Sequence, residues 1–196
     1  MINRSHTWDL RSSNSVPFAY QVGYFSDIEC DSIIEQGLQL PTVESFLGTN
    51  EVDNSIRRNL VGFFENHRTD HHWIYQKLAK AVNDFNDQFW KFDLNFIETL
   101  QFTRYDRPND FYTDHIDTSF GRTEQRKLSV SVQLSNPDTY TGSDLLFLKV
   151  GDSYYDPIRQ RGSIIMFPSF MFHQVTPITS GVRYSLVSWI IGPPFK

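Results

Sequence analysis

The sequence lacks several features that particular protein classes require. Its 196 residues include one cysteine, Cys30, so no disulfide can form within the chain and nothing indicates an oxidising compartment. No stretch approaches the roughly 20 apolar residues of a membrane span, and the first residues hold no apolar run of signal-peptide length. We therefore expect a soluble protein without a membrane partner, in the cytoplasm by default.

Positive charge is also scarce. The chain has 18 Lys and Arg against 23 Asp and Glu, which gives a formal net charge of -5 at pH 7. A general nucleic-acid binder needs a basic face that displaces counterions from phosphates, so we expect no nucleic-acid partner. The sequence also shows no internal repeat, no low-complexity tract and no linker long enough to divide it.

Apolar and aromatic residues, in contrast, suffice for a folded core. Hydrophobic residues make up 39% of the chain and aromatic residues 15%. At this length they can build one substantial core, and the aromatic share favours strands that pack on strands or helices. Residues 1–15 are polar and predict a flexible N-terminal arm. Residues 16–196 predict a single domain.

Helical patterns are confined to the first half of the chain. Residues 17–25 are aromatic and β-branched and predict a first strand. A capping box of the form S-x-x-E opens a predicted helix over residues 26–38. Apolar residues recur every three or four positions over residues 70–90, which predicts an amphipathic second helix. The polar residues 48–59 have no periodicity and predict a surface loop.

The second half consists of short β-type runs separated by turn residues. The runs lie at residues 98–106, 111–117, 127–135, 144–150, 163–168, 172–177 and 182–191. Such a series suits a sandwich or a jelly roll, in which two sheets enclose a core. The predicted fold class is therefore α+β and mainly β, with a jelly-roll core over about residues 97–196 and the N-terminal helices against one sheet.

Three potential metal ligands lie on the predicted strands. His115 and Asp117 flank Ile116 at a strand end, where the two-residue period places both polar side chains on one face. His173 follows on a later strand. Two imidazoles and one carboxylate, with further coordination positions open, are the ligand set of non-haem iron(II) oxygenases. Alone, an H-x-D triplet is common, and a lone histidine is more often a core or surface side chain.

A cation suited to an acidic cosubstrate follows ten residues after His173. The alternation over residues 182–191 places four side chains on one face, those of Arg183, Ser185, Val187 and Trp189. A guanidinium fork matches a carboxylate, and the Ser185 hydroxyl can bond the same group. An isolated arginine is more often a surface ion-pair partner. The triad and the arginine together, in this order, are much more specific than either alone.

On these motifs the chain resembles the prolyl 4-hydroxylase branch of the 2-oxoglutarate- and iron(II)-dependent dioxygenases, and among them bacterial and phage hydroxylases. The matching stretches are residues 105, 111–117, 126–134, 140–145, 167–169, 173, 183–186 and 189–195. The resemblance implies a double-stranded β-helix (jelly roll). It also implies Fe(II) bound by His115, Asp117 and His173, and 2-oxoglutarate with its distal carboxylate on Arg183. O2 is the implied co-reactant and L-ascorbate a possible reductant.

The chain departs from this family pattern at one visible place. Ser143 stands where the family often has the second of two glycines. A serine costs little there unless its backbone needs a positive φ. The departure therefore concerns the local geometry of the strand and leaves the metal ligands unaffected.

Three residues near the cosubstrate allow two interpretations each. Tyr105 lies where this branch often places a tyrosine that contacts the cosubstrate, but it also suits a strand tyrosine in the core. Ser131 and Gln133 form the polar face of their strand, which either lines the site or meets solvent. We include Tyr105, Gln133 and Ser185 among the candidate cosubstrate-binding residues.

Three further residues are candidates for the substrate side of the pocket. Tyr112 and Trp189 either shape the substrate mouth or belong to the core. Arg57, next to Arg58 in the predicted loop, either guides an anionic or peptide substrate or is simply exposed.

The implied activity is hydroxylation of a C–H bond, coupled to oxidative decarboxylation of 2-oxoglutarate to succinate. By resemblance the substrate is a peptidyl proline in a peptide or protein. A free amino acid or small metabolite is one alternative, and a non-catalytic jelly-roll module that binds a metal or ligand is another. Specificity in such enzymes depends on loops, which we expect at residues 48–59 and 118–126. The sequence does not indicate an oligomeric state.

Overall fold

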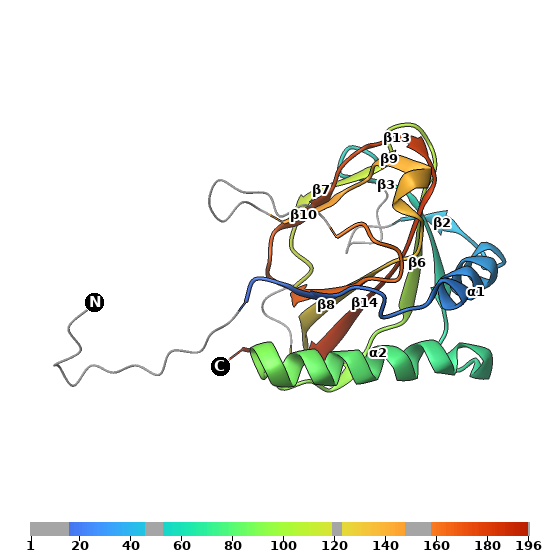
Figure 1. Ribbon diagram of the computed structural model, residues 1–196. Helices are drawn as coiled ribbons and strands as arrows, with labels where there is room; N and C mark the ends of the chain where they lie inside the picture. Colours follow the sequence, from blue (N-terminus) through green and yellow to red (C-terminus); the bar gives the residue numbers. More distant parts are fainter. Residues whose placement is uncertain (1–15, 46–52, 119–122, 148–157, 196) are drawn as a thin grey trace, which may run out of the picture.

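The computed structural model describes residues 16–45, 53–118, 123–147 and 158–195 (Figure 1). The predicted N-terminal arm lies outside the described residues, as do parts of both predicted loops. Among the helices in the described ranges, none is both long and apolar enough to cross a membrane.

The predicted helix with the capping box is confirmed as α1 (Asp27–Leu38). The Ser26 hydroxyl accepts a hydrogen bond from the Glu29 backbone N–H, and the Glu29 carboxylate accepts one from the Ser26 backbone N–H. This reciprocal pair satisfies two backbone donors at the helix start. The first predicted strand is shorter than expected, because only β1 (Ala19–Gln21) of residues 17–25 is extended and paired.

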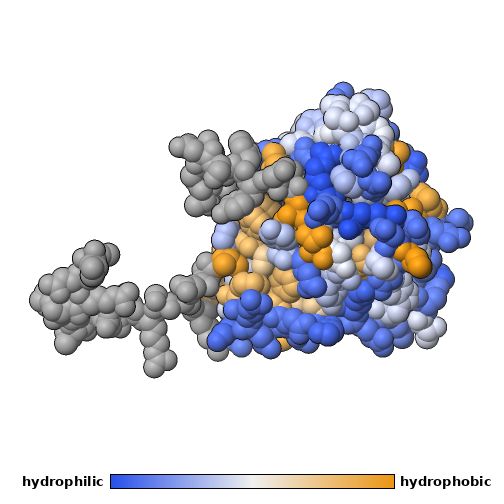
Figure 2. Space-filling model, in the orientation of Figure 1, coloured by the Kyte–Doolittle hydropathy of each residue, from blue (hydrophilic) through white to orange (hydrophobic). Residues whose placement is uncertain are grey.

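The second predicted helix is confirmed as α2 (His72–Phe85). A 3₁₀ turn, η1 (Thr69–His71), precedes it, and a π-helical turn, η2 (Asn86–Trp90), continues it. The helix runs along one side of the sheet, and its outward surface is mainly hydrophilic (Figures 1 and 2). The other face of α2 is buried, as the apolar period predicts.

The larger sheet is antiparallel, with strand order β1-β11-β8-β14-β6-β4-β2 and β5 paired to β14. Its further strands are β2 (Val43–Glu44), β4 (Leu60–Phe64), β5 (Phe96–Ile97), β6 (Leu100–Tyr105), β8 (Gln125–Gln133), β11 (Ile164–Pro168) and β14 (Arg183–Gly192). Strands β6, β8, β11 and β14 lie within or overlap runs that the sequence predicts, whereas β4 lies in none of them.

The smaller sheet has the order β10-β12-β7-β3. Its strands are β3 (Arg57–Arg58), β7 (Phe111–His115), β10 (Leu145–Phe147) and β12 (His173–Val175). A separate two-stranded sheet pairs β9 (Tyr140–Gly142) with β13 (Ile178–Gly181), and the turn η3 (Pro137–Thr139) precedes β9. The two sheets form the predicted jelly roll. The prediction of a surface loop is wrong at its end, because β3 pairs with β7 and Arg57 is only 7% exposed.

The larger sheet is apolar on one face and largely polar on the other. On β8, Leu128, Val130 and Val132 join the core that α1 and α2 cover. The intervening Ser129, Ser131 and Gln133 are also buried, but they belong to the side that faces the smaller sheet. The helix side of the sheet therefore provides the larger hydrophobic core, and the opposite side provides buried polar groups for a site.

The departure from the family pattern at Ser143 has a structural cost. Ser143 has φ of +54°, which is left-handed backbone, and its buried hydroxyl has no hydrogen-bond partner among the described residues. The preceding Gly142, at φ +75°, could not carry a side chain, because an added Cβ would lie 2.2 Å from the Pro177 carbonyl oxygen. The backbone at Ser143 therefore has a positive φ, the condition under which a serine is less favourable than a glycine.

Candidate metal centre and cosubstrate pocket

The three predicted metal ligands lie close together, two on the adjacent strands β7 and β12 and one just after β7. His173 on β12 lies directly opposite His115 on β7 in the antiparallel register. Asp117 follows β7, and its backbone N–H donates to the Ser169 carbonyl at 2.8 Å. One ligand atom from each of the three side chains lies within 4.8 Å of the others. The Asp117 carboxylate is 3.5 Å from Nε2 of each histidine.

Both imidazoles are held in the tautomer that a metal ligand needs. Nδ1 of His115 is 2.7 Å from the Thr113 carbonyl oxygen, and Nδ1 of His173 is 2.9 Å from the Met171 carbonyl oxygen. A carbonyl oxygen can only accept, so each Nδ1 carries the proton. In the neutral form of each imidazole, Nε2 is then the nitrogen with a free lone pair, which can bind an ion between the three side chains.

The charge states of the carboxylate and the buried imidazole also suit a metal. Burial raises the pKa of Asp117, but the nearby His173 and His115 and the Ser129 hydroxyl outweigh burial and hold that pKa well below its usual range. Burial lowers the pKa of His173, although Asp117 opposes this effect. At neutral pH Asp117 is ionised and His173 is neutral, the forms in which both side chains bind metals.

Ser129 connects the metal site to the larger sheet. Its hydroxyl donates to the Asp117 carboxylate at 2.7 Å and lies 2.9 Å from the Ser169 hydroxyl. Such partners orient a metal ligand. The alternation on β8 that singles out Ser131 and Gln133 also includes Ser129. Ser169 belongs to a stretch that matches the family pattern, but its contact with Ser129 has no local sequence signal, because the two residues lie far apart along the chain.

The predicted cosubstrate arginine is buried and lacks an acidic partner among the described residues. Arg183 is 2% exposed, and its Nε and Nη2 donate to the side-chain oxygen of Gln133 at 3.2 and 2.9 Å. Arg183 also lies opposite Tyr105 in the register, with its guanidinium carbon 5.5 Å from the Tyr105 ring centroid. A buried guanidinium bound only to neutral groups is prepared for an external carboxylate.

One pocket includes the triad and most of the other candidates. Its lining includes His115, Asp117, His173, Arg183, Ser185, Tyr105, Ser131, Tyr112, Trp189 and Arg57. The predicted strand faces of Arg183, Ser185 and Trp189 are therefore confirmed. Gln133 does not meet solvent, because it is 3% exposed and bonded to Arg183. Tyr105 is both buried and part of the lining, so its two interpretations do not exclude each other.

The substrate-side candidates form the wall between this pocket and an adjoining groove. Tyr112, Trp189 and Arg57 line both spaces. The Tyr112 ring stacks on His115 with 3.5 Å between centroids, and the Arg57 guanidinium carbon lies 4.6 Å above the Tyr112 ring. Arg126, to which the sequence assigns no role in the site, stacks on Trp189 with 3.8 Å between its guanidinium carbon and the ring centroid.

The comparison with protein families agrees with this geometry. Residues 100–191 match the model of the 2OG-Fe(II) oxygenase superfamily. Over its jelly-roll half the chain is therefore similar to this superfamily. A PKHD-type hydroxylase of Synechococcus sp. (strain CC9605) is 37% identical over 79 residues, which are 40% of this chain and 36% of that protein. The chain thus spans well under two thirds of that relative's length.

Solved structures of prolyl hydroxylases share the fold of this chain. A viral collagen prolyl hydroxylase from Paramecium Bursaria Chlorella virus-1, in its 2OG complex, has a TM-score of 0.69 at 20% identity and covers 90% of this chain and 97% of its own. A Trichoplax adhaerens prolyl hydroxylase, bound to a hypoxia inducible factor peptide, has a TM-score of 0.74 at 15% identity, with 90% and 84% covered. At these identities the likeness concerns the fold.

Fe(II) and 2-oxoglutarate, which give the superfamily its name, fit the residues of this chain. Two imidazoles and one carboxylate are a suitable donor set for Fe(II), and as three protein ligands they leave coordination positions for a cosubstrate. The buried Arg183 provides the matching cation for a dicarboxylate.

Proposed function

We propose that the protein is an Fe(II)- and 2-oxoglutarate-dependent hydroxylase. The observation that carries this proposal is the presence, in one pocket, of a preorganised His-Asp-His triad and a buried arginine without an acidic partner among the described residues. A non-catalytic binding module would not need both. Structural ions are usually bound by four protein ligands, whereas this triad offers three.

Each residue has a defined task in this proposal. His115, Asp117 and His173 bind the iron, with Ser129 orienting the carboxylate. Arg183 binds the distal carboxylate of 2-oxoglutarate, Gln133 holds the guanidinium in place, and Ser185 and Tyr105 complete that end of the pocket. When bound, Fe(II) and 2-oxoglutarate together reduce O2, release succinate and CO2, and hydroxylate a substrate C–H bond.

The proposed substrate is a proline within a peptide. The groove beside the triad offers room next to the metal for a chain to lie, and its wall contains the aromatic rings of Tyr112 and Trp189. A structural neighbour, the Trichoplax adhaerens enzyme, is described with a bound peptide, which supports this class of substrate. A free amino acid is the alternative that the substrate assay below distinguishes.

Anaerobic titration of the protein with Fe(II) and 2-oxoglutarate tests the cofactor part of the proposal. We expect a visible charge-transfer band of the iron–cosubstrate chelate. His173→Ala should abolish the band. Arg183→Met should weaken 2-oxoglutarate binding at least 100-fold, because it removes the buried cation that pairs with the carboxylate. A wild-type protein without the band, or a His173→Ala variant that binds both ligands normally, would contradict the proposal.

Succinate release tests the substrate. Proline-containing peptides should stimulate succinate formation more than free amino acids do, and a product mass increased by one oxygen atom should accompany it. If only L-proline or another free amino acid stimulates turnover, the small-molecule alternative is correct. If the chelate forms but no substrate in either set stimulates succinate release, the proline assignment fails while the cofactor assignment stands.

A further inference from the structure

Arg57 is a buried cation in the wall of the metal pocket, and it has no carboxylate partner among the residues that the structure describes. It is 7% exposed, and its Nε donates to the side-chain oxygen of Asn59 at 3.0 Å. Its guanidinium lies against the Tyr112 ring, the other side of which is occupied by the ring contact with His115. One aromatic ring therefore separates this charge from a proposed iron ligand.

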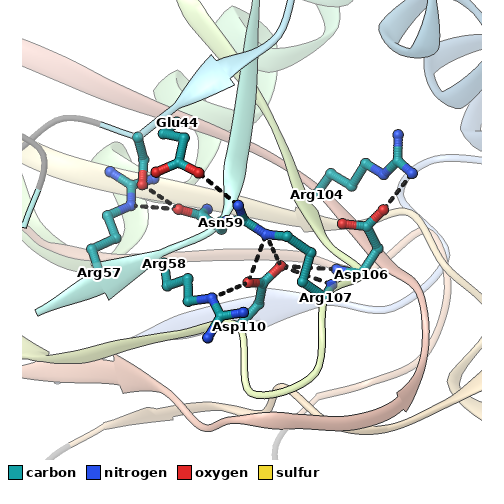
Figure 3. A network of polar contacts seen from close by, with 9 residues as sticks. Glu44, Arg57, Arg58, Asn59, Arg104, Asp106, Arg107 and Asp110 are labelled. Atoms are coloured by element: carbon teal, nitrogen blue, oxygen red, sulfur yellow. Dashed lines mark hydrogen bonds and ion pairs between the residues drawn. The ribbon is translucent and has the colours of Figure 1, made fainter. Parts of the chain in front are cut away.

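The carboxylates that Figure 3 shows in the polar network with Arg57 are paired with other arginines. Asp110 pairs with Arg58 and Arg107, and Arg107 also pairs with Glu44. Asp106 pairs with Arg104. In the same view Arg57 reaches only the amide of Asn59 within this network.

This lack of an acid sets Arg57 apart from nearly all other arginines. In the part of the chain that the structure describes, every arginine except Arg57 and Arg183 forms an ion pair with an Asp or Glu. These two unpaired arginines line the same pocket. Arg183 has a proposed ligand in 2-oxoglutarate, so Arg57 is the cation that remains without an anion.

The net charge of the loaded pocket leads to the same conclusion, and this step rests on the proposed function. Fe(II) brings two positive charges and Arg183 one, while Asp117 brings one negative charge and 2-oxoglutarate two. These charges cancel, so Arg57 gives the loaded pocket one surplus positive charge. A buried charge without a partner is costly, and an anion from outside the protein removes that cost.

We infer that Arg57 binds a carboxylate of the substrate and selects anionic substrates over neutral ones. The carboxylate has two possible sources. It is either the side chain of an Asp or Glu beside the oxidised residue of a peptide, or the α-carboxylate of a free amino acid. Both would reach the metal pocket along the groove that Arg57 lines.

A binding experiment tests the anion site without knowledge of the substrate. The protein is saturated anaerobically with Fe(II) and 2-oxoglutarate at fixed ionic strength and then titrated with acetate or, as the neutral counterpart, acetamide. We expect acetate, and not acetamide, to raise the unfolding temperature of the wild-type protein. In Arg57→Met the apparent affinity for acetate should fall at least tenfold, whereas Arg57→Lys should retain most of the response.

Arg58→Met is the matched control, because it removes the neighbouring arginine, whose side chain is 39% exposed and paired with Asp110. It should respond to acetate as the wild-type protein does. An acetate response that survives in Arg57→Met, or its absence from the wild-type protein, overturns the inference. If 2-oxoglutarate itself fails to stabilise the protein before acetate is added, the proposed function fails instead. A loss of 2-oxoglutarate affinity in Arg57→Met as large as in Arg183→Met would show that Arg57 binds the cosubstrate, which also overturns the inference.

Turnover distinguishes the two sources of the carboxylate. Succinate release is compared for peptides that differ only in Glu or Gln beside the proline, and for L-proline against L-prolinamide. The pair whose anionic member is preferred at least tenfold in kcat/KM identifies the source, and Arg57→Met should remove that preference. Equal kcat/KM values within both pairs would contradict the inference.

Discussion

Replacing Gln133 by glutamate should give Arg183 a carboxylate partner within the protein, in place of the carboxylate of the cosubstrate. Gln133 and glutamate have nearly the same shape, and the Gln133 oxygen already accepts hydrogen bonds from Nε and Nη2 of Arg183 at 3.2 and 2.9 Å. A glutamate carboxylate in this place would form a buried ion pair with the guanidinium. 2-Oxoglutarate would then meet a neutralised arginine and a neighbouring like charge.

The size of the effect follows from the burial of the pair. Close charge pairs in desolvated interfaces couple by about 1.5–7 kcal/mol, and Arg183 and Gln133 are 2% and 3% exposed. A loss of about 3 kcal/mol corresponds to about a 100-fold lower affinity for 2-oxoglutarate. The ligand-free variant should be no less stable than the wild-type protein, because the arginine gains a counter-ion.

Anaerobic calorimetric titration with 2-oxoglutarate measures the affinity, and urea unfolding of the ligand-free protein measures the stability. Gln101→Glu provides the control, since it places the same charge on the pocket wall without a hydrogen bond to Arg183. It should weaken 2-oxoglutarate binding much less than Gln133→Glu does. An affinity of Gln133→Glu within threefold of the wild-type value would refute the role of Arg183 as the carboxylate-binding group.

Three further predictions concern stability, each measured by urea unfolding. Replacing a glycine within a helix by alanine usually stabilises the helix. At Gly37, however, the added Cβ would lie 2.6 Å from the buried Phe102 ring. Gly37→Ala should therefore lower the free energy of unfolding by about 1–3 kcal/mol, while Fe(II) still binds. Ser143→Gly should stabilise the protein by about 1 kcal/mol, because it relieves a left-handed serine with an unpaired buried hydroxyl, and a loss of stability would contradict this reasoning. Burial raises the pKa of the Cys30 thiol from 9.0 to about 11, so the folded protein keeps a proton that the unfolded chain loses. Between about pH 9 and 11 the free energy of unfolding should therefore fall more steeply with pH in the wild-type protein than in Cys30→Ala. The difference between the two slopes should be at most roughly 1.4 kcal/mol per pH unit.

The sequence predicts well those parts of the site that depend on local periodicity. The two-residue period of a strand is enough to place Arg183, Ser185 and Trp189 on one face, and the H-x-D spacing is enough to place His115 beside Asp117. These inferences need no knowledge of which strands are neighbours. The capping box of the first helix is a local signal of the same kind.

Features that depend on pairing between distant segments could not be predicted. Arg57 follows a polar stretch, and β3 has only two residues, so nothing local indicates that it pairs with β7 and becomes buried. Ser169 contacts Asp117 and Ser129 only through the arrangement of separate segments. The left-handed backbone at Ser143 is likewise imposed by its surroundings, since a serine favours no such conformation.

The two walls of the pocket belong to different sheets. Arg183 and Gln133 stand on long central strands of the larger sheet, whose opposite face carries the core, so few substitutions near them would be tolerated. Arg57 lies on the two-residue edge strand of the smaller sheet. Exchanges at this edge can alter which molecule is accepted without disturbing the groups proposed for the cosubstrate, so a new substrate preference could evolve, or be engineered, through changes in β3 alone.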